Sequence, residues 1–465
     1  MNAGMLLLPR IPSVALMFLS LLMLLFGNVL SFTFIIHKNE VPIRITKRQQ
    51  QHCRNGAMGD SFCDSIHVVQ ELLTNQGVTS LDVLSPSSLS GDAEDADDES
   101  QTILLAAGTK RGNTIMFNLD VEKLRSESLR PNDEIYPFSQ CLQDERFQQK
   151  PYPIYSMKFF VVKDGNIGLA CGGGDRYLTI WQVNATMGSS SIIDADWRIH
   201  ATLGPHTGWV KDVAFDGLNH RLYSIGCNCI EAWGINESMS WHHLKKRTIE
   251  SSPDGATLSS DLLCLTMENS NLEDTAAPTL LSAGVDGRVH VWPNDLIDAC
   301  NLRPLRSVRA HDGRVNAIAT ARLSTATLLL SVSNDGTLQC RVFKKYSDKY
   351  IFDYRSVLSI GGDNLRMISM SCVTLAATSD SGERVLVAMG TSDGHFTIAE
   401  VQQSKLDEEL SVQMNRKMPL AKLSDGSIHA IVNVPWNGGD GGSSTSQKLF
   451  AVGHSNGLTL VSCST

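Results

Sequence analysis

Histidine, aspartate and cysteine side chains recur at the turns of this sequence, and these are residue types that bind metals or transfer protons. Cys227 and Cys229 are separated by one residue, and His242 is followed directly by His243. A metal site generally needs a second ligand pair at a recognisable spacing, which both pairs lack. We therefore expect the two cysteines to pack on one face of a strand and the two histidines to lie in a loop.

Signatures of phosphate binding and of nucleophilic catalysis are missing from the sequence. The three glycines from Gly172 to Gly174 lack the following Lys and Ser or Thr, and the helix start, that a phosphate-binding loop needs. We do not identify a nucleophile elbow, the strand-to-helix turn that carries a catalytic Ser with a following acid and His. The sequence therefore predicts no catalytic centre, metal or cofactor. The His and Asp residues at the turns are expected to form structural hydrogen bonds.

The composition is typical of a β-rich protein with many turns. The chain has 465 residues, 36 glycines and a formal net charge of −9. An acidic balance argues against general nucleic-acid binding, which depends on a basic surface. The 11 cysteines are scattered and odd in number, so we expect buried reduced thiols rather than a disulfide framework.

Short alternating strands separated by tight turns recur along most of the chain. In residues 204–235 a Gly-Pro-His turn leads into three such strands, and the last contains Trp233. Asp-Gly or Asn-Gly pairs at the equivalent turns supply the positive φ angles that tight hairpins need. Seven units are recognised, covering residues 63–120, 136–185, 204–235, 241–295, 305–343, 351–401 and 420–463.

Over residues 64–463 this pattern resembles the WD40-repeat family, whose signature is a Gly-His near the start and a Trp-Asp near the end of each repeat. The resemblance implies an all-β fold, a seven-bladed β-propeller of four-stranded antiparallel blades. In that family the Asp of a tight turn bonds the His of the entry turn, and a strand hydroxyl and the Trp complete the network. The matching residues here are Asp175, Trp181, His206, Ser224, Trp233, Asp286, Trp292, His311, Asp335 and Asp393.

No unit keeps all four members of the family's network. Cys227 stands where the Asp is expected in the third unit, and Arg341 stands where the Trp is expected in the fifth. The second and fourth units lack the His of the entry turn. We therefore expect partial networks in all blades.

The last unit offers only three strands before the chain stops at Thr465. The segment from Ser65 to Gln70 precedes the first unit and has the composition of a strand. We expect it to supply the outer strand of the seventh blade, which would close the ring and cover an exposed strand edge.

Binding rather than catalysis is the function expected of this array. In WD40 propellers the turns that carry the entry His and the Asp surround the central channel on one face, where partners commonly dock. We interpret the chain as a non-enzymatic scaffold whose rim receives an acidic or phosphorylated segment of a partner protein. Solvated surface charges, a membrane-tethered trafficking or coat module, and an enzyme with a site in the channel are the alternatives. The rim residues are Lys110, Arg111, Arg176, Trp209, Arg288, Arg314 and His395.

Four segments differ in composition from the rest of the chain, two ahead of the propeller, which is assigned to residues 63–465, and two loops within it. Residues 1–36 form a hydrophobic signal or anchor segment, expected to be helical, and residues 37–62 form a basic linker or transit-like segment. Retention of residues 14–36 would place the propeller at a membrane facing the cytosol, because basic residues follow the segment. Cleavage near Ser31 would instead deliver it to a plastid or the secretory lumen. A further alternative is a gene-model error, in which the start has been mispredicted upstream of Met58. The acidic loop 91–100 is expected to be disordered, and the Gly/Ser-rich loop 437–447 to be flexible.

Overall fold

The computed structural model describes the strands and turns that make up one compact unit, Val41–Thr465. The expected anchor, the basic linker, the acidic loop 91–100 and almost all of the loop 437–447 lie outside the described residues. Among the described residues no helix is long and apolar enough to cross a bilayer. The described residues are 66–72, 77–84, 102–120, 139–142, 144, 150–162, 166–183, 196–236, 240–248, 261–268, 278–293, 304–324, 326–346, 349–360, 365–375, 383–406, 409–416, 420–435 and 447–464.

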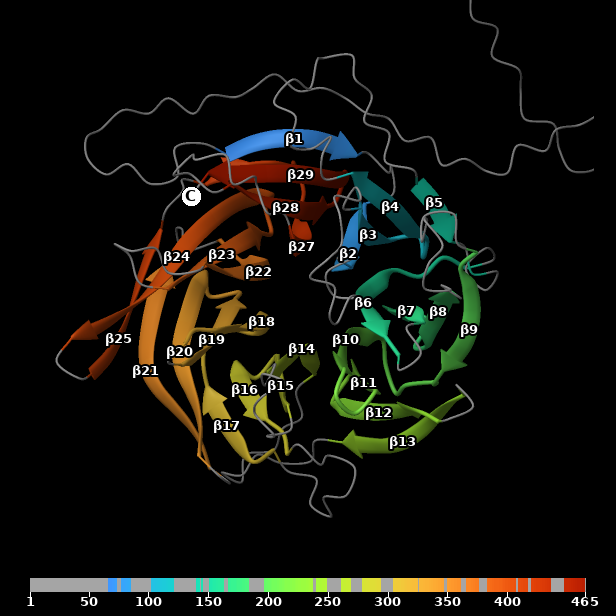
Figure 1. Cartoon of the computed structure of the whole chain (residues 1–465), viewed down its shortest axis with the longest axis horizontal. Helices are drawn as coiled ribbons and strands as arrows, with labels where there is room; N and C mark the ends of the chain where they lie inside the picture. Colours follow the sequence, from blue (N-terminus) through green and yellow to red (C-terminus); the bar gives the residue numbers. More distant parts are fainter. Residues whose placement is uncertain are drawn as a thin grey trace, which may run out of the picture. The chain divides into compact units, whose positions relative to one another are not determined.

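Seven antiparallel sheets are arranged in a ring, and each has one strand on the inside and one at the periphery (Figure 1). The fold is therefore an all-β, seven-bladed propeller, as predicted. From the inner to the outer strand, the first three blades are β2 (Val78–Leu84), β3 (Thr102–Thr109), β4 (Thr114–Asp120) and β5 (Ser139–Leu142); β6 (Ile154–Val161), β7 (Ile167–Gly173), β8 (Leu178–Val183) and β9 (Arg198–Leu203); and β10 (Val210–Asp216), β11 (Arg221–Gly226), β12 (Cys229–Ile235) and β13 (Trp241–Thr248).

The remaining four blades repeat the same order, and the sixth carries one additional short strand, β26 (Ala421–Lys422), paired with its third strand. They are β14 (Leu262–Glu268), β15 (Thr279–Gly284), β16 (Arg288–Val291) and β17 (Arg306–Arg309); β18 (Val315–Arg322), β19 (Thr327–Ser333), β20 (Thr337–Tyr346) and β21 (Lys349–Ser359); β22 (Met367–Leu375), β23 (Arg384–Thr391), β24 (His395–Leu406) and β25 (Glu409–Arg416); and β27 (Ile428–Val434), β28 (Gln447–His454), β29 (Gly457–Ser464) and β1 (Ile66–Leu72).

The repeating units of the sequence and the blades of the structure are offset by one strand. The strand β13 lies within the fourth sequence unit, yet it pairs with β12 and completes the third blade. The strands β17 and β21 complete the fourth and fifth blades in the same way. Each of the first six blades therefore takes its outer strand from chain that comes after its own repeat, which ties successive units together.

The ring is closed by the strand that begins the described chain. β1 pairs with β29 antiparallel, from Ile66 opposite Cys463 to Leu72 opposite Leu458. The inner strands of the first and last blades, β2 and β27, are also in contact. The predicted closure by the N-terminal segment is confirmed.

Neighbouring blades fit together through a repeated contact between an apolar side chain and a glycine. The first residue of each inner strand is apolar and buried, as in Val78 and Val210. A Cβ added at Gly172 of β7 would lie 2.5 Å from Cγ1 of Val210, and one added at Gly453 of β28 would lie 2.6 Å from Cγ1 of Val78. These glycines make room for the side chain of the next blade, so close packing requires them.

Removal of residues 1–77 is expected to lower the melting temperature sharply, because it deletes β1 and exposes the edge of β29. Removal of residues 1–64 keeps β1 and serves as the control. Thermal unfolding followed by circular dichroism measures both. Equal melting temperatures for the two truncated chains would refute closure by β1.

Substitution Gly172→Ala is expected to destabilise the protein by about 1–3 kcal/mol, the usual range for overpacking a well-packed core. Gly217 in an exposed turn provides the control, since its nearest neighbour to an added Cβ is Cε1 of Phe215 at 3.9 Å. Urea unfolding of Gly172→Ala and Gly217→Ala checks this. Similar midpoints for both variants would mean that the glycine contact does not hold the blades together.

Candidate functional site

The turns that carry the predicted rim residues meet at one end of the inner strands. In six blades the N–H of the first residue after the second strand donates to the carbonyl of the residue before the inner strand. Turns of adjacent blades are also joined, because the N–H of His206 donates to the carbonyl of Arg176 at 2.9 Å. The rim is therefore a continuous face built from several blades. The six pairs are Lys110 and Gly77, Gly174 and Pro153, Val285 and Asp261, Asn334 and Arg314, Ser392 and Arg366, and Ser455 and Ser427.

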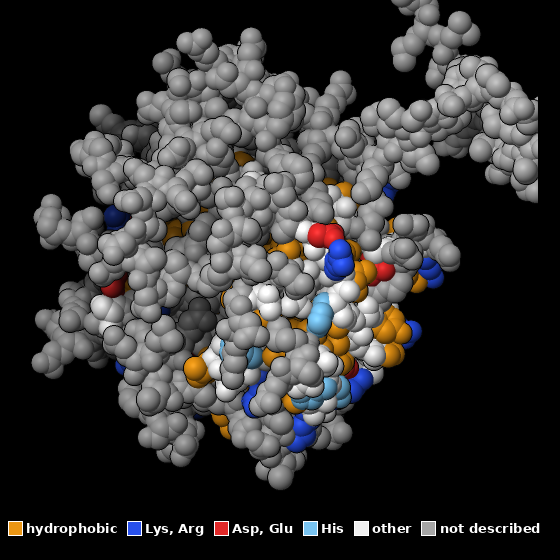
Figure 2. Space-filling view, turned by 45° about the vertical axis from the view of Figure 1, so that its right-hand side comes forward, with side chains coloured by type: hydrophobic (Ala, Val, Ile, Leu, Met, Phe, Trp, Pro, Cys, Tyr) orange, Lys and Arg blue, Asp and Glu red, His pale blue; other side chains and the backbone are white. Residues whose placement is uncertain are grey.

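Basic side chains of the rim are largely exposed. The guanidinium groups of Arg111, Arg176 and Arg314 are open to solvent and form no ion pair with any residue that the structure describes. Arg288 is partly buried, and Lys110 donates to Ser455 Oγ at 3.3 Å. In Figure 2 basic and histidine side chains lie scattered among apolar ones on the described surface, and acidic groups show at few points.

Trp209 is the exposed aromatic side chain of the rim, with 52% of its surface accessible. Its ring stacks on Tyr155 with a centroid distance of 5.6 Å and an interplanar angle of 24°. Nζ of Lys211 lies 3.9 Å from the ring centroid of Tyr155 and 4.6 Å from that of Trp209. Burial lowers the pKa of Lys211, and the charge of Arg314 lowers it further, while Asp261 acts in the opposite direction. The cluster of Tyr155, Trp209 and Lys211 is therefore an ordered platform that carries a positive charge.

Sequence reasoning identified Trp209 and missed the other two members of this cluster. Tyr155 and Lys211 are the second residues of β6 and β10, and a register shift skips both of them in the pairing with the second strand. A β-bulge of this kind redirects the side chain that it releases. All seven inner strands have the shift at the same place, between Val78 and Ser80, Ile154 and Ser156, Val210 and Asp212, Leu262 and Cys264, Val315 and Ala317, Met367 and Ser369, and Ile428 and Ala430.

A buried network holds the turn that precedes Trp209. Nε2 of His206 lies 2.7 Å from Ser224 Oγ, and the indole N–H of Trp233 donates to the same oxygen at 2.9 Å. Nδ1 of His206 lies 3.2 Å from the carbonyl oxygen of Arg176. Burial lowers the pKa of His206, so the ring remains neutral near pH 7. The three members predicted for this blade are brought together, and they link Arg176 to the loop of Trp209.

Two residues at rim turns have the left-handed backbone that Gly usually adopts. Arg176 has φ of 71°, whereas Gly287 and Gly336 occupy the corresponding positions after an Asp with φ of 72° and 75°. Cys227 has φ of 56° in a turn of two residues between β11 and β12. An L residue in this region costs on the order of 1 kcal/mol. Backbone strain of this kind clusters at functional sites.

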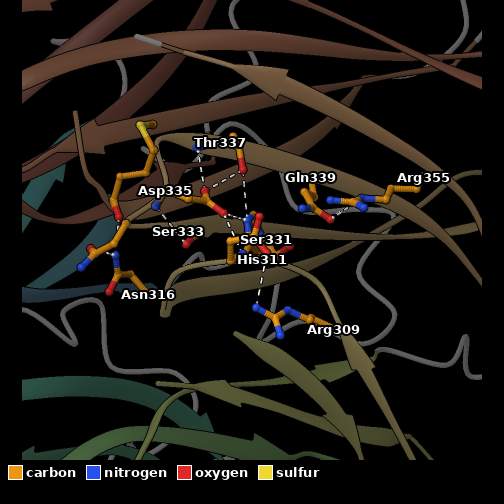
Figure 3. Close-up of polar contacts among 12 residues, drawn as sticks. Arg309, His311, Asn316, Ser331, Ser333, Asp335, Thr337, Gln339 and Arg355 are labelled. Atoms are coloured by element: carbon orange, nitrogen blue, oxygen red, sulfur yellow. Dashed lines mark hydrogen bonds and ion pairs between the residues drawn. The ribbon is translucent and has the colours of Figure 1, made fainter. Parts of the chain in front are cut away.

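The fifth blade contains the predicted contact between His311 and Asp335 (Figure 3). Nδ1 of His311 lies 3.0 Å from Asp335 Oδ2, and Nε2 lies 2.9 Å from Ser331 Oγ. Thr337 Oγ1 donates to Asp335 Oδ1 at 2.7 Å. Burial is the largest single influence and raises the pKa of Asp335, but the hydrogen bonds from Thr337 and the contact with His311 together outweigh it and hold the pKa below its usual value. This network fixes the entry loop that ends at Arg314.

In the fourth blade a histidine from an unexpected position replaces the missing His of the entry turn. Nε2 of His290, within β16, lies 3.2 Å from Asp286 Oδ2, and its Nδ1 lies 2.7 Å from Ser307 Oγ. Trp292 donates its indole N–H to Ser282 Oγ at 2.9 Å. The Trp and Asp predicted for this blade are thus both engaged, but in two separate contacts.

The second and sixth blades show further local arrangements. Asp175 accepts a bond from the backbone N–H of Tyr177 at 3.1 Å, and Trp181 of the same blade is buried in the core. Nδ1 of His395 lies 2.9 Å from Asp393 Oδ2. His395, predicted as a rim residue, is therefore paired within its own turn.

Two histidines of the seventh blade lie beside the rim. Nε2 of His429 is 3.2 Å from Ser455 Oγ, and Nε2 of His454 is 3.0 Å from Thr459 Oγ1. Burial lowers the pKa of His429 to about 4, with a further contribution from the charge of Lys110. Burial likewise lowers the pKa of His454 to about 4, assisted by His429. Both rings are neutral at pH 7.

The cysteines and acidic side chains offer no metal centre within the described part of the chain. No group of three or more His, Cys, Asp or Glu residues is placed there to hold an ion. The eight described cysteines are free thiols, and burial raises the pKa of Cys171 and Cys340 to about 12. Such thiols are unreactive packing residues.

No protein-family model matches the sequence, and no match is found among curated proteins.

The neutral buried ring of His454 predicts a specific loss of stability in acid. Its pKa lies near 4 in the folded state and near 6.5 when unfolded, so the unfolded chain binds the proton first. The associated stability, up to about 3 kcal/mol, is present above pH 6.5 and is lost as the pH falls to 4. Urea unfolding at pH 7, 5 and 4 should show a smaller acid loss for His454→Gln than for the unsubstituted chain. The exposed His242→Gln is the control, and an acid loss unchanged by His454→Gln would contradict the assignment.

Proposed function

We propose that this protein is a non-enzymatic scaffold that binds an acidic or phosphorylated segment of a partner protein on its rim face. The observation that carries the proposal is the exposed Trp209, which is stacked on Tyr155 and held beside the ammonium group of Lys211. A propeller fold is typical of interaction scaffolds, and this cluster gives one face of it a defined anchor.

The physical properties of the rim support this choice of partner. Trp and Arg are the residue types that contribute most to interface energies, and an aromatic ring already held by packing loses little conformational entropy on binding. Arg111, Arg176 and Arg314 surround the rim without ion pairs to the described residues. A segment that combines carboxylate or phosphate groups with an apolar side chain would satisfy both features.

The networks of the third and fifth blades support assignment to the WD40-like class of propellers. His206 with Ser224 and Trp233, and His311 with Ser331 and Asp335, join an entry turn to its own blade. In both cases the polar groups bond each other and fix a loop. That arrangement favours a structural role for these residues over catalysis. We also propose, from the sequence alone, that residues 14–36 attach the scaffold to a membrane with the propeller facing the cytosol.

Reversal of charge at Arg111, Arg176, Arg288 and Arg314 together is expected to weaken binding of the partner more than a hundredfold. Loss of four charged contacts and new repulsion of an acidic segment account for this size. Partners captured from the native source by affinity purification, and then measured individually by biolayer interferometry, provide the readout.

Controls separate the rim from the remainder of the surface. Trp209→Ala should reduce affinity at least tenfold, whereas Leu218→Ala should leave it unchanged. Leu218 is an exposed apolar residue in the turn between β10 and β11, at the other end of the same blade. A partner that binds the fourfold variant and Trp209→Ala with undiminished affinity would refute the proposal.

A further inference from the structure

Arg341 occupies the position in the fifth blade that Trp233 and Trp292 occupy in the third and fourth. Trp233 lies opposite Leu222 and donates to Ser224, two residues further along the neighbouring strand. Arg341 lies opposite Leu329, and Ser331 again follows two residues later. The fold at this point is suited to an indole ring, yet the chain places a cation there.

The surroundings of Arg341 provide little compensation for its charge. Nη2 donates to the carbonyl oxygen of Arg309 at 3.1 Å, and Nε is buried without a hydrogen-bond partner among the described residues. Arg355 is directly opposite on β21. Burial, together with the positive charge of Arg355, lowers the pKa of Arg341. Like charges directly opposite each other in antiparallel strands are destabilising.

Acidic side chains do little to neutralise the arginines in this region. The Nε of Arg355 donates to the neutral amide oxygen of Gln339 at 3.1 Å (Figure 3). Nη2 of Arg309 pairs with Asp312 at 3.3 Å, but both side chains are highly exposed, so the pair contributes little. Arg341 and Arg355 are therefore directly opposed in the fifth blade, and neither has a carboxylate partner among the described residues.

We propose that Arg341 and Arg355 form a binding site for a phosphate monoester group. A phosphate dianion presents three acceptor oxygens and matches the planar donor groups of two arginines at once. It would neutralise the opposed charges of Arg341 and Arg355. Both residues are distinct from the rim residues, so this site does not depend on the proposed function.

Isothermal titration of the full chain tests this site with two probes at constant ionic strength, inorganic phosphate and a short peptide containing phosphoserine. We expect saturable binding of at least one probe. Arg355→Gln should weaken binding at least tenfold, and Arg341→Trp should abolish it. Equal affinity for both probes would show that the site recognises the phosphate group alone. Tighter binding of the peptide would identify a phosphorylated side chain as the natural ligand.

Two controls keep the test independent of folding. Arg341→Trp restores the residue found in the third and fourth blades, where the indole donates to a serine, so its melting temperature should not fall. Arg306→Gln removes a positive charge from the neighbouring strand β17 without changing an arginine of the site, and it should not affect binding. Failure of both probes to bind, or unchanged affinity in Arg355→Gln and Arg341→Trp, would overturn the proposal.

Discussion

The contact between one blade and the next is the interaction on which this structure depends. A single four-stranded sheet with two apolar faces cannot bury either face alone, and each blade here is covered by its neighbours in the ring. Val210 reaches over Gly172, and Val78 reaches over Gly453 in the same manner. The last of these contacts joins the end of the described chain to its beginning. Stability is therefore shared by all seven blades, and closure by β1 matters as much as any core residue.

The same constraint explains where the rim residues lie. Because every inner strand begins at the same end of the ring, the entry loops and the turns after the second strands are gathered on one face. The bulge at the start of each inner strand then releases one side chain from the pairing. In β6 and β10 these side chains are Tyr155 and Lys211, which support Trp209. The ring thus determines both the position and the rigidity of the aromatic cluster.

Much of this architecture could be predicted from the sequence, because it rests on local patterns. Alternating apolar residues, Gly-containing turns and a strand-like segment ahead of the first unit were sufficient for seven blades and their closure. The network of His206, Ser224 and Trp233 was expected from the resemblance to the WD40 pattern. The limit was reached where contacts depend on neighbours distant in sequence.

Three features illustrate that limit in physical terms. Tyr155 joins Trp209 only because a bulge redirects it, and no residue type marks that bulge in the sequence. His290 supports Asp286 from within a strand, which the family pattern of an entry-turn His does not anticipate. The arginine opposite Arg341 becomes apparent only once the register of β20 and β21 is known.

The most direct test of the central claim is site-specific photo-crosslinking in the native host, with a photoreactive amino acid placed at Trp209 or, as a comparison, at Leu218. Our account predicts that the probe at Trp209 forms a discrete crosslink to a partner, that the crosslink disappears when Arg176 and Arg314 are both changed to Glu, and that the probe at Leu218 forms none. Crosslinks of equal yield from both positions, insensitive to those two substitutions, would contradict the assignment of the rim as the binding face.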